Sequence, residues 1–152
     1  AVGSLIHALL RHPEALARVR ADRSLLPQAV EEMLRWNGPI GVLPRILPAD
    51  AELLGQKLPA GSTILAGLSA ATRDPAVFSD PDRFDLDRTH KSQLAFGFGQ
   101  HFCLGAHLAR AELVVALEVL LERLPGLRLI EEPRFVGCVI RGPERLRVAI
   151  EG

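Results

Sequence analysis

The spacing of apolar residues in the first part of the chain predicts three helices. Residues 4–11 form a short apolar stretch, and Pro13 then fits the first position of a second helix that runs to about residue 21. A third helix is predicted from Pro27 to about residue 36, because apolar residues recur there at helical intervals. These apolar residues are Ala29, Val30, Met33 and Leu34.

The pattern changes after this third helix. Residues 40–66 are typical of an extended chain, with turns indicated at Gly55 and at residues 59–61. Residues 73–93 are rich in Asp, Pro and Arg and show little periodicity, which predicts a long irregular loop. Such loops are uncommon in compact domains and are often functional.

Residues 104–124 have the strongest helical pattern in the chain, and Pro125 and Gly126 end it. Its apolar stripe consists of Leu108, Leu113, Val114, Leu117, Leu120, Leu121 and Leu124. Short strands are predicted near residues 127–130, 135–140 and 145–150. The pattern therefore indicates an α+β, mainly helical chain, with residues 1–152 forming a single domain.

Composition excludes several classes of function. The 18 basic and 18 acidic residues leave no cationic excess for binding nucleic acid. The apolar runs are too short to cross a membrane. Two cysteines are too few for a disulfide scaffold or a four-thiolate zinc site, so a cytoplasmic setting is expected. One of them, Cys138, lies in no motif and is interpreted as a core thiol.

The other cysteine lies in a glycine-rich segment, FGFGQHFCLG, at residues 96–105. Cys103 directly precedes the long predicted helix, whose free N–H groups and partial positive charge favour a thiolate. Gly97, Gly99 and Gly105 leave room for a flat macrocycle beside the sulfur. His101 is placed to meet an anionic group at the rim of such a ligand.

This segment is open to two other interpretations. A lone cysteine is usually a small buried core residue, although the surrounding glycines and phenylalanines make that less convincing here. A glycine-rich loop before a helix can also hold a phosphate, but this segment lacks the required spacing and the terminal Lys and Ser.

Residues 96–110, FGFGQHFCLGAHLAR, closely resemble the cysteine-ligand loop of bacterial cytochromes P-450. The resemblance implies the proximal, C-terminal part of that fold, with short β-strands and with haem b as the cofactor. It also implies that Cys103 binds the haem iron, that His101 contacts a haem propionate and that Phe96 packs beside the thiolate. Gly97 and Gly105 would complete the haem-binding loop.

Two further segments match the same family. Glu32 and Arg35 form its E-x-x-R pair, and Arg83 belongs to its P-x-R-F segment. The resemblance implies that these three residues form a structural ion cluster that holds the irregular loop beneath the haem. Taken alone, a Glu and an Arg three residues apart are usually a solvated pair.

Arg45 matches a propionate-binding arginine of the family, since a guanidinium suits a carboxylate. The alternative is a surface arginine in a strand. The resemblance also makes Val42, Leu43, Val139 and Ile140 candidates for lining a cavity that holds an apolar substrate. Core packing explains these four residues nearly as well.

The resemblance covers essentially the whole chain but not the whole family fold. No A-G-x-[DE]-T segment, which delivers protons in the family, occurs here, so no catalytic residue is assigned. We expect a C-terminal fragment that lacks the N-terminal half of a monooxygenase. The parent would insert one oxygen atom of O2 into an apolar organic substrate, using a ferredoxin as electron donor. The fragment would bind its missing half or self-associate.

Two alternatives differ from the fragment interpretation. In the first, the chain is a natural short haem protein that acts as a peroxidase-like enzyme or a haem carrier. In the second, it is a non-catalytic interaction domain that keeps the motifs.

Overall fold

A computed structural model of the chain describes residues 1–89 and 93–150. In that part, the α-helices are α1 (Val2–Arg11), α2 (Pro13–Ala21), α3 (Leu26–Asn37), α4 (Leu68–Ala71) and α5 (Ala106–Arg123). The 3-10 helices are η1 (Arg23–Leu25) and η2 (Gly99–His101). The strands are β1 (Val42–Ile46), β2 (Ala51–Leu53), β3 (Gln56–Leu58), β4 (Thr63–Gly67), β5 (Leu127–Leu129), β6 (Phe135–Val136), β7 (Gly142–Pro143) and β8 (Val148–Ile150).

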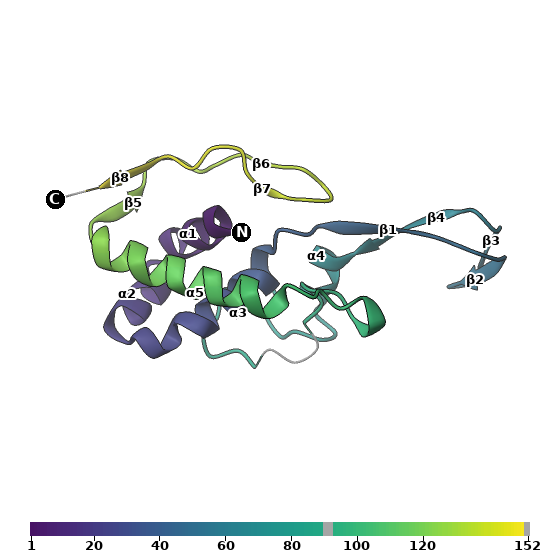
Figure 1. The fold of residues 1–152 in the computed structure, drawn as a ribbon, viewed down its shortest axis with the longest axis horizontal. Coiled ribbons are helices and arrows are strands. Elements are labelled where there is room, and N and C mark those ends of the chain that lie inside the picture. The colour runs from purple at the N-terminus through teal and green to yellow at the C-terminus, as the bar shows by residue number, and fades with distance from the viewer. Residues whose placement is uncertain (90–92, 151–152) are drawn as a thin grey trace.

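The helices form one body from which the first four strands extend (Figure 1). Helices α1, α3 and α5 contact one another, and β5 and β7 contact α1. The buried core lies between these helices and consists largely of Leu5, Leu9, Val19, Val30, Met33, Leu113, Leu117 and Leu121. Burial of these side chains is the main force that holds the helices together. The prediction of a mainly helical α+β chain is confirmed.

The predicted helices lie close to where the pattern placed them. Helix α2 begins at Pro13, which has no N–H to donate and so fits the first turn. In α3, all four predicted apolar residues are buried. No helix in the described residues is both long and apolar enough to cross a bilayer.

The extended region is built from paired antiparallel strands. Strand β1 pairs with β4, with Val42 opposite Gly67 and Arg45 opposite Ile64. Strand β2 pairs with β3 through a turn at Leu54 and Gly55, where φ is +50° and +77°. The predicted turn at Gly55 is therefore confirmed, since glycine adopts this conformation without steric cost.

The remaining strands are shorter than predicted. Strand β5 pairs with β8, and β6 pairs with β7. From Arg73 to Thr89 the chain forms neither helix nor strand, which agrees with the predicted irregular loop, and its residues 90–92 lie outside the described chain. The structure adds one short helix, α4, which the sequence pattern did not predict.

The first turn of α5 differs from the prediction. Leu113, Leu117 and Leu121 of the predicted stripe are buried, but Leu108 exposes 64% of its surface. Leu108 lies two residues after the start of α5, beyond the part of the helix that packs against α1 and α3. An apolar side chain is thus left open beside the Cys103 loop.

Candidate functional site

Backbone hydrogen bonds fold the segment before α5 into a compact loop. The Cys103 N–H donates to the Phe96 carbonyl oxygen at 2.9 Å, and the Phe102 N–H donates to the Gly99 oxygen at 3.0 Å. Gly97 and Gly99 have φ of +78° and +69°, values that side chains disfavour. These glycines therefore let the loop turn back and place Cys103 just before α5.

The sulfur of Cys103 lies open to solvent. Cys103 is a free, exposed cysteine. A side chain at Gly105 would begin 4.0 Å from its Sγ atom, and one at Gly99 would meet nothing within 4 Å. Gly105 thus leaves the space beside the sulfur free of a side chain.

Large apolar side chains surround this cysteine in the sequence and are exposed with it. The exposed fractions are 86% for Phe98, 46% for Phe102, 100% for Leu104 and 64% for Leu108. Such a group of exposed apolar residues marks a surface that another apolar body covers. An open thiol at a helix N-terminus with an apolar rim fits the face of a haem, whose iron takes a thiolate as axial ligand.

Phe96 lies within this loop rather than at its rim. It is half-buried against the core cluster, and its ring centroid is 6.5 Å from that of Phe102. The Arg110 guanidinium stacks over the Phe96 ring at 4.5 Å. Phe96 thus joins the Cys103 loop to the helical core.

Both basic residues that the sequence assigns to propionates are exposed. His101 ends η2 in the cysteine loop, and Arg45 lies in β1. The recorded hydrogen bond of the Arg45 side chain runs from Nη1 to the neighbouring Pro44 carbonyl oxygen at 2.9 Å. The guanidinium therefore keeps donors for a carboxylate. Both β1 and the loop before α5 lie toward the same end of the molecule (Figure 1).

The structure brings the two candidate cavity-lining segments together. The Val42 N–H donates to the Cys138 oxygen at 3.1 Å, and the Gly41 N–H donates to the Val139 oxygen at 3.1 Å. Val42 and Leu43 are half-buried, while Val139 and Ile140 are exposed. Cys138 is also exposed, so its interpretation as a core thiol is wrong: it lies in a surface turn.

Gly137→Ala should lower the free energy of unfolding by about 1–3 kcal/mol more than Gly55→Ala does. Both glycines have a positive φ, +87° and +77°. A Cβ atom at Gly137 would lie 1.9 Å from the Ile140 oxygen, whereas one at Gly55 meets nothing within 4 Å. The free energy of unfolding in urea measures the difference. Equal losses in the two variants would contradict the close approach in the turn that carries Val139 and Ile140.

Glu32 and Arg35 form a fully buried ion pair. Two hydrogen bonds of 2.8 Å join the Arg35 Nε and Nη2 atoms to the two carboxylate oxygens of Glu32. Both side chains are 0% exposed. The remaining donors of Arg35 reach the carbonyl oxygens of Pro81 and Arg83 in the irregular loop and of Thr72 just before it. The pair therefore ties α3 to that loop, as the sequence predicted.

The prediction that the Arg83 side chain completes this cluster is wrong. Arg83 contributes its backbone carbonyl, which accepts from Arg35 at 3.0 Å, and its side chain is exposed. The second guanidinium is that of Arg88, whose Nε lies 3.3 Å from a Glu32 oxygen and whose side chain is only 8% exposed. The chain turns between the two arginines, so Arg88 points inward and Arg83 outward.

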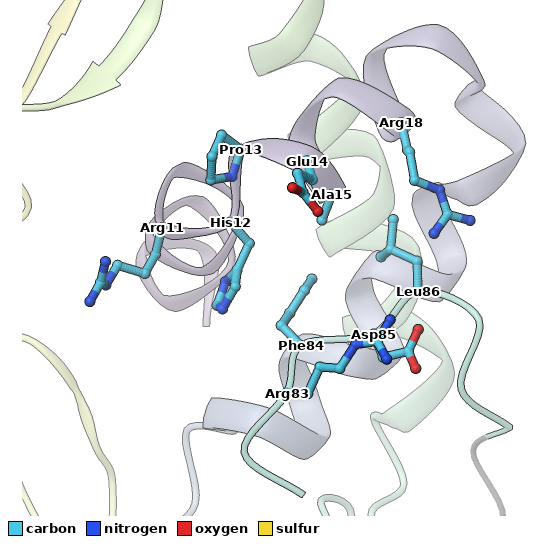
Figure 2. Close-up of a pocket in the computed structure, with 10 residues that line it drawn as sticks. All are labelled: Arg11, His12, Pro13, Glu14, Ala15, Arg18, Arg83, Phe84, Asp85 and Leu86. Carbon is cyan, nitrogen blue, oxygen red and sulfur yellow. The ribbon is translucent and has the colours of Figure 1, made fainter. Parts of the chain in front are cut away.

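Arg83 instead borders a cavity of about 360 Å³ at the start of α2 (Figure 2). Another residue of this cavity, Arg18, holds Asp87 through hydrogen bonds of 2.6 and 2.9 Å. These hydrogen bonds lower the pKa of the Asp87 carboxyl below its usual range, and the same contact raises the pKa of Arg18. This exposed pair fastens the irregular loop to α2 from outside.

The structure contains a second polar cluster that the sequence did not predict. Arg110 of α5 forms an ion pair with Glu31 of α3, and the Gln93 amide donates to Glu31 at 2.9 Å. These contacts fasten both ends of the Cys103 loop to α3. Glu31 directly precedes Glu32 in the sequence, but no spacing signal relates it to Arg110, which lies 79 residues away.

No group of three or more His, Cys, Asp or Glu residues in residues 1–89 and 93–150 is arranged to hold a metal ion. A lone cysteine such as Cys103 suits a metal that brings its other ligands with it, as the iron of a haem does.

Two curated relatives align with nearly the whole chain. The mycinamicin IV hydroxylase/epoxidase of Micromonospora griseorubida is 48% identical over 155 residues, covering 97% of this chain and 38% of the relative. The steroid C26-monooxygenase of Mycolicibacterium smegmatis is 46% identical over 143 residues, covering 92% of this chain and 36% of the relative. The chain thus spans well under half the length of these relatives.

The structural comparison leads to the same family. The solved structure of a cytochrome P-450 from Chondromyces apiculatus matches with a TM-score of 0.93 and 43% identity, covering 99% of this chain and 40% of that one. The family model described as cytochrome P-450 matches residues 4–125. Since this match takes in the buried ion pair, the irregular loop and the Cys103 loop, the chain belongs to the cytochrome P-450 family.

Proposed function

We propose that residues 1–152 form the proximal, haem-binding part of a haem-thiolate monooxygenase, which inserts one oxygen atom of O2 into an apolar organic substrate. The observation that carries the proposal is the exposed Cys103 at the N-terminus of α5, with open space at Gly105 and an apolar rim. Relatives that cover the same segments are a hydroxylase/epoxidase and a monooxygenase.

Each residue of the site has a role in this proposal. Haem b, when bound, supplies the iron that activates oxygen. Cys103 would hold the iron through its sulfur, with Phe96, Gly97 and Gly105 forming the loop around it. Arg45 and His101 would bind the propionates, because both side chains are exposed and the segments that carry them, β1 and the loop before α5, lie toward the same end of the molecule (Figure 1).

The substrate would lie against the paired segments that carry Val42, Leu43, Val139 and Ile140. Three backbone hydrogen bonds hold these segments in register. Two are the bonds from Gly41 and Val42 described above, and in the third the Arg141 N–H donates to the Pro39 oxygen at 2.7 Å. Their apolar side chains suit an apolar small molecule. A ferredoxin-type donor would supply electrons, and the exposed cysteines fit a reducing, cytoplasmic setting.

The exposed apolar rim also needs a cover. In this proposal haem covers the part around Cys103, and the rest of the family fold, or a second copy of the chain, covers what remains. The names of these relatives, a hydroxylase/epoxidase and a monooxygenase, lend no support to a peroxidase-like enzyme, a haem carrier or a non-catalytic interaction domain.

Haem titration tests the proposal most directly. We expect the purified chain to bind added haem and, after reduction and addition of carbon monoxide, to show the red-shifted absorption band of thiolate-ligated iron. Circular dichroism of the same sample verifies that the chain is folded. A folded chain that binds no haem, or that shows only the band of histidine-ligated iron, would contradict the proposal.

A further inference from the structure

A second cavity lies apart from the cysteine loop. It has a volume of about 360 Å³ and is enclosed by α1, the end of α3, α4 with the start of the irregular loop, and the β6–β7 pair. Its walls are formed by His7, Trp36, Asn37, Ser69, Arg73, Phe135 and Arg141. None of their side chains has a part in the proposed haem or substrate site, so the cavity requires its own explanation.

The charged residues that line this cavity are both cations. Arg73 and Arg141 contribute guanidinium groups, and no Asp or Glu is among the lining residues. Burial lowers the pKa of Arg73, and the nearby positive charges of Arg35 and Arg141 lower it further, while Asp82 opposes them. Two like charges are therefore held close together where an anion would relieve their repulsion.

Both guanidinium groups are fixed in place by contacts that leave donors over. Arg73 donates from Nε to the Trp36 oxygen at 3.0 Å and from Nη1 to Asp82 at 2.9 Å. Arg141 donates from Nη1 to the Asn37 side-chain oxygen at 2.7 Å. In the described residues, no hydrogen bond is recorded from Nη2 of either arginine. Rigid guanidinium groups with spare donors suit an oxyanion.

Each of the two guanidinium groups also stacks on an aromatic ring. The Arg73 guanidinium stacks over Trp36 at 5.0 Å, and that of Arg141 stacks over Phe135 at 4.8 Å. These contacts limit the conformations of both side chains, so less entropy is lost when a ligand binds. The cavity is therefore already shaped for its ligand.

His7 provides an independent sign that a polar ligand belongs here. Its Nε2 atom hydrogen-bonds to Glu132 at 3.0 Å, but its Nδ1 atom is buried and has no partner in the described chain. A buried polar atom without a partner is costly and needs an explanation. Because Nε2 donates to the Glu132 carboxylate, Nδ1 of a neutral His7 is an acceptor, and a water bound beside a ligand in this cavity would supply its donor.

We propose that this cavity binds a small oxyanion, a phosphate or a carboxylate group, between Arg73 and Arg141. The site is distinct from that of the proposed monooxygenase reaction and does not depend on it. Glu132 and Asp82 bind the lining residues His7 and Arg73 but are not themselves among the lining residues, so neither carboxylate occupies the anion position.

Trp36 makes the proposal easy to test, because it is the only tryptophan in the chain and it lines the cavity. The purified chain is titrated with sodium phosphate and, separately, with sodium acetate, while sodium chloride keeps the ionic strength constant. We expect a saturable change in tryptophan fluorescence with at least one of the two anions, and its relative affinity tells phosphate from carboxylate. A response equal to that of chloride alone would overturn the proposal.

Two variants identify the groups that bind the anion. Arg141→Gln should weaken binding roughly tenfold or more, because a charge-assisted contact to the anion is lost. Arg123→Gln, a matched charge change at the exposed end of α5, should leave the affinity unchanged. Equal affinities in the two variants would overturn the assignment.

Thermal unfolding of the unsubstituted chain covers the case in which Arg141→Gln does not fold. A ligand that binds only the folded state raises the unfolding midpoint. We expect the effective anion to raise the midpoint above that in chloride at equal ionic strength. An unchanged midpoint at saturating anion would contradict the proposal without any variant.

Discussion

Arg35→Ala should lower the free energy of unfolding by about 3–5 kcal/mol, the usual cost of leaving one partner of a buried ion pair behind. Glu32 would keep its charge in a fully buried position while losing two hydrogen bonds of 2.8 Å. Three backbone carbonyl oxygens would also lose a donor. Arg35 touches no part of the open face around Cys103 in these contacts, so its effect should arise through folding alone.

Arg88 and Arg83 provide the internal comparison. Arg88→Ala should cost about 1–3 kcal/mol, because it removes charge-assisted hydrogen bonds to buried groups. Arg83→Ala should change stability by about 0.5 kcal/mol or less, as exposed substitutions usually do. Urea unfolding followed by circular dichroism measures all three variants. A larger loss of stability in Arg83→Ala than in Arg88→Ala would show that the Arg83 side chain belongs to the cluster after all.

Haem loading separates folding from chemistry in the same series. If the cluster is structural, Arg35→Ala should lose haem in proportion to the loss of folded chain. A stable, haem-loaded Arg35→Ala protein with only a slower chemical step would contradict a structural role.

The wrong prediction for Arg83, whose expected place in the cluster is taken by Arg88, shows that the sequence does not predict side-chain directions in an irregular segment. The Glu32–Arg35 pair lies on a helix, where a spacing of three residues fixes a shared face. Arg83 and Arg88 lie in a segment without regular structure, and nothing periodic tells which side chain points inward. The direction is set by tertiary contacts, such as the Asp85 N–H that donates to Glu32 at 2.8 Å.

The same distinction applies to the fold. The long helix and its buried Leu113, Leu117 and Leu121 follow from the apolar periodicity. The four-residue α4 and the two-residue β7 are too short to have a periodicity of their own. They form because their surroundings hold them, as where α4 packs against α3 and β1.

The candidate site divides in a similar way. The Cys103 loop is continuous in sequence, so its glycines, histidine and cysteine could be recognised together. The proposed oxyanion cavity combines Arg73 with Arg141, and the ion pair that fastens the Cys103 loop to α3 combines Glu31 with Arg110. Residues so far apart in the chain become neighbours only after folding, so no local pattern predicts either cluster.

Cys103→Ser should abolish the red-shifted carbon monoxide band of the reduced haem-bound chain, whereas Cys138→Ser should leave it intact. Both cysteines are free and exposed, so the two substitutions make the same chemical change in comparable surroundings. Cys138 contributes its backbone carbonyl to Val42, a contact that serine keeps. Cys103 alone stands before the N-terminus of α5, in the glycine-rich loop.

The serine hydroxyl replaces the thiol with almost no change in shape, so the loop should remain folded. Its backbone closure depends on the Cys103 N–H and the Phe96 oxygen, and serine preserves both. Haem affinity should fall roughly tenfold or more, since the apolar rim remains but the bond to iron is lost. Absorbance spectra of the two variants, recorded beside the unsubstituted chain, give the result. Retention of the thiolate band by Cys103→Ser, or its loss in Cys138→Ser, would move the axial ligand away from Cys103.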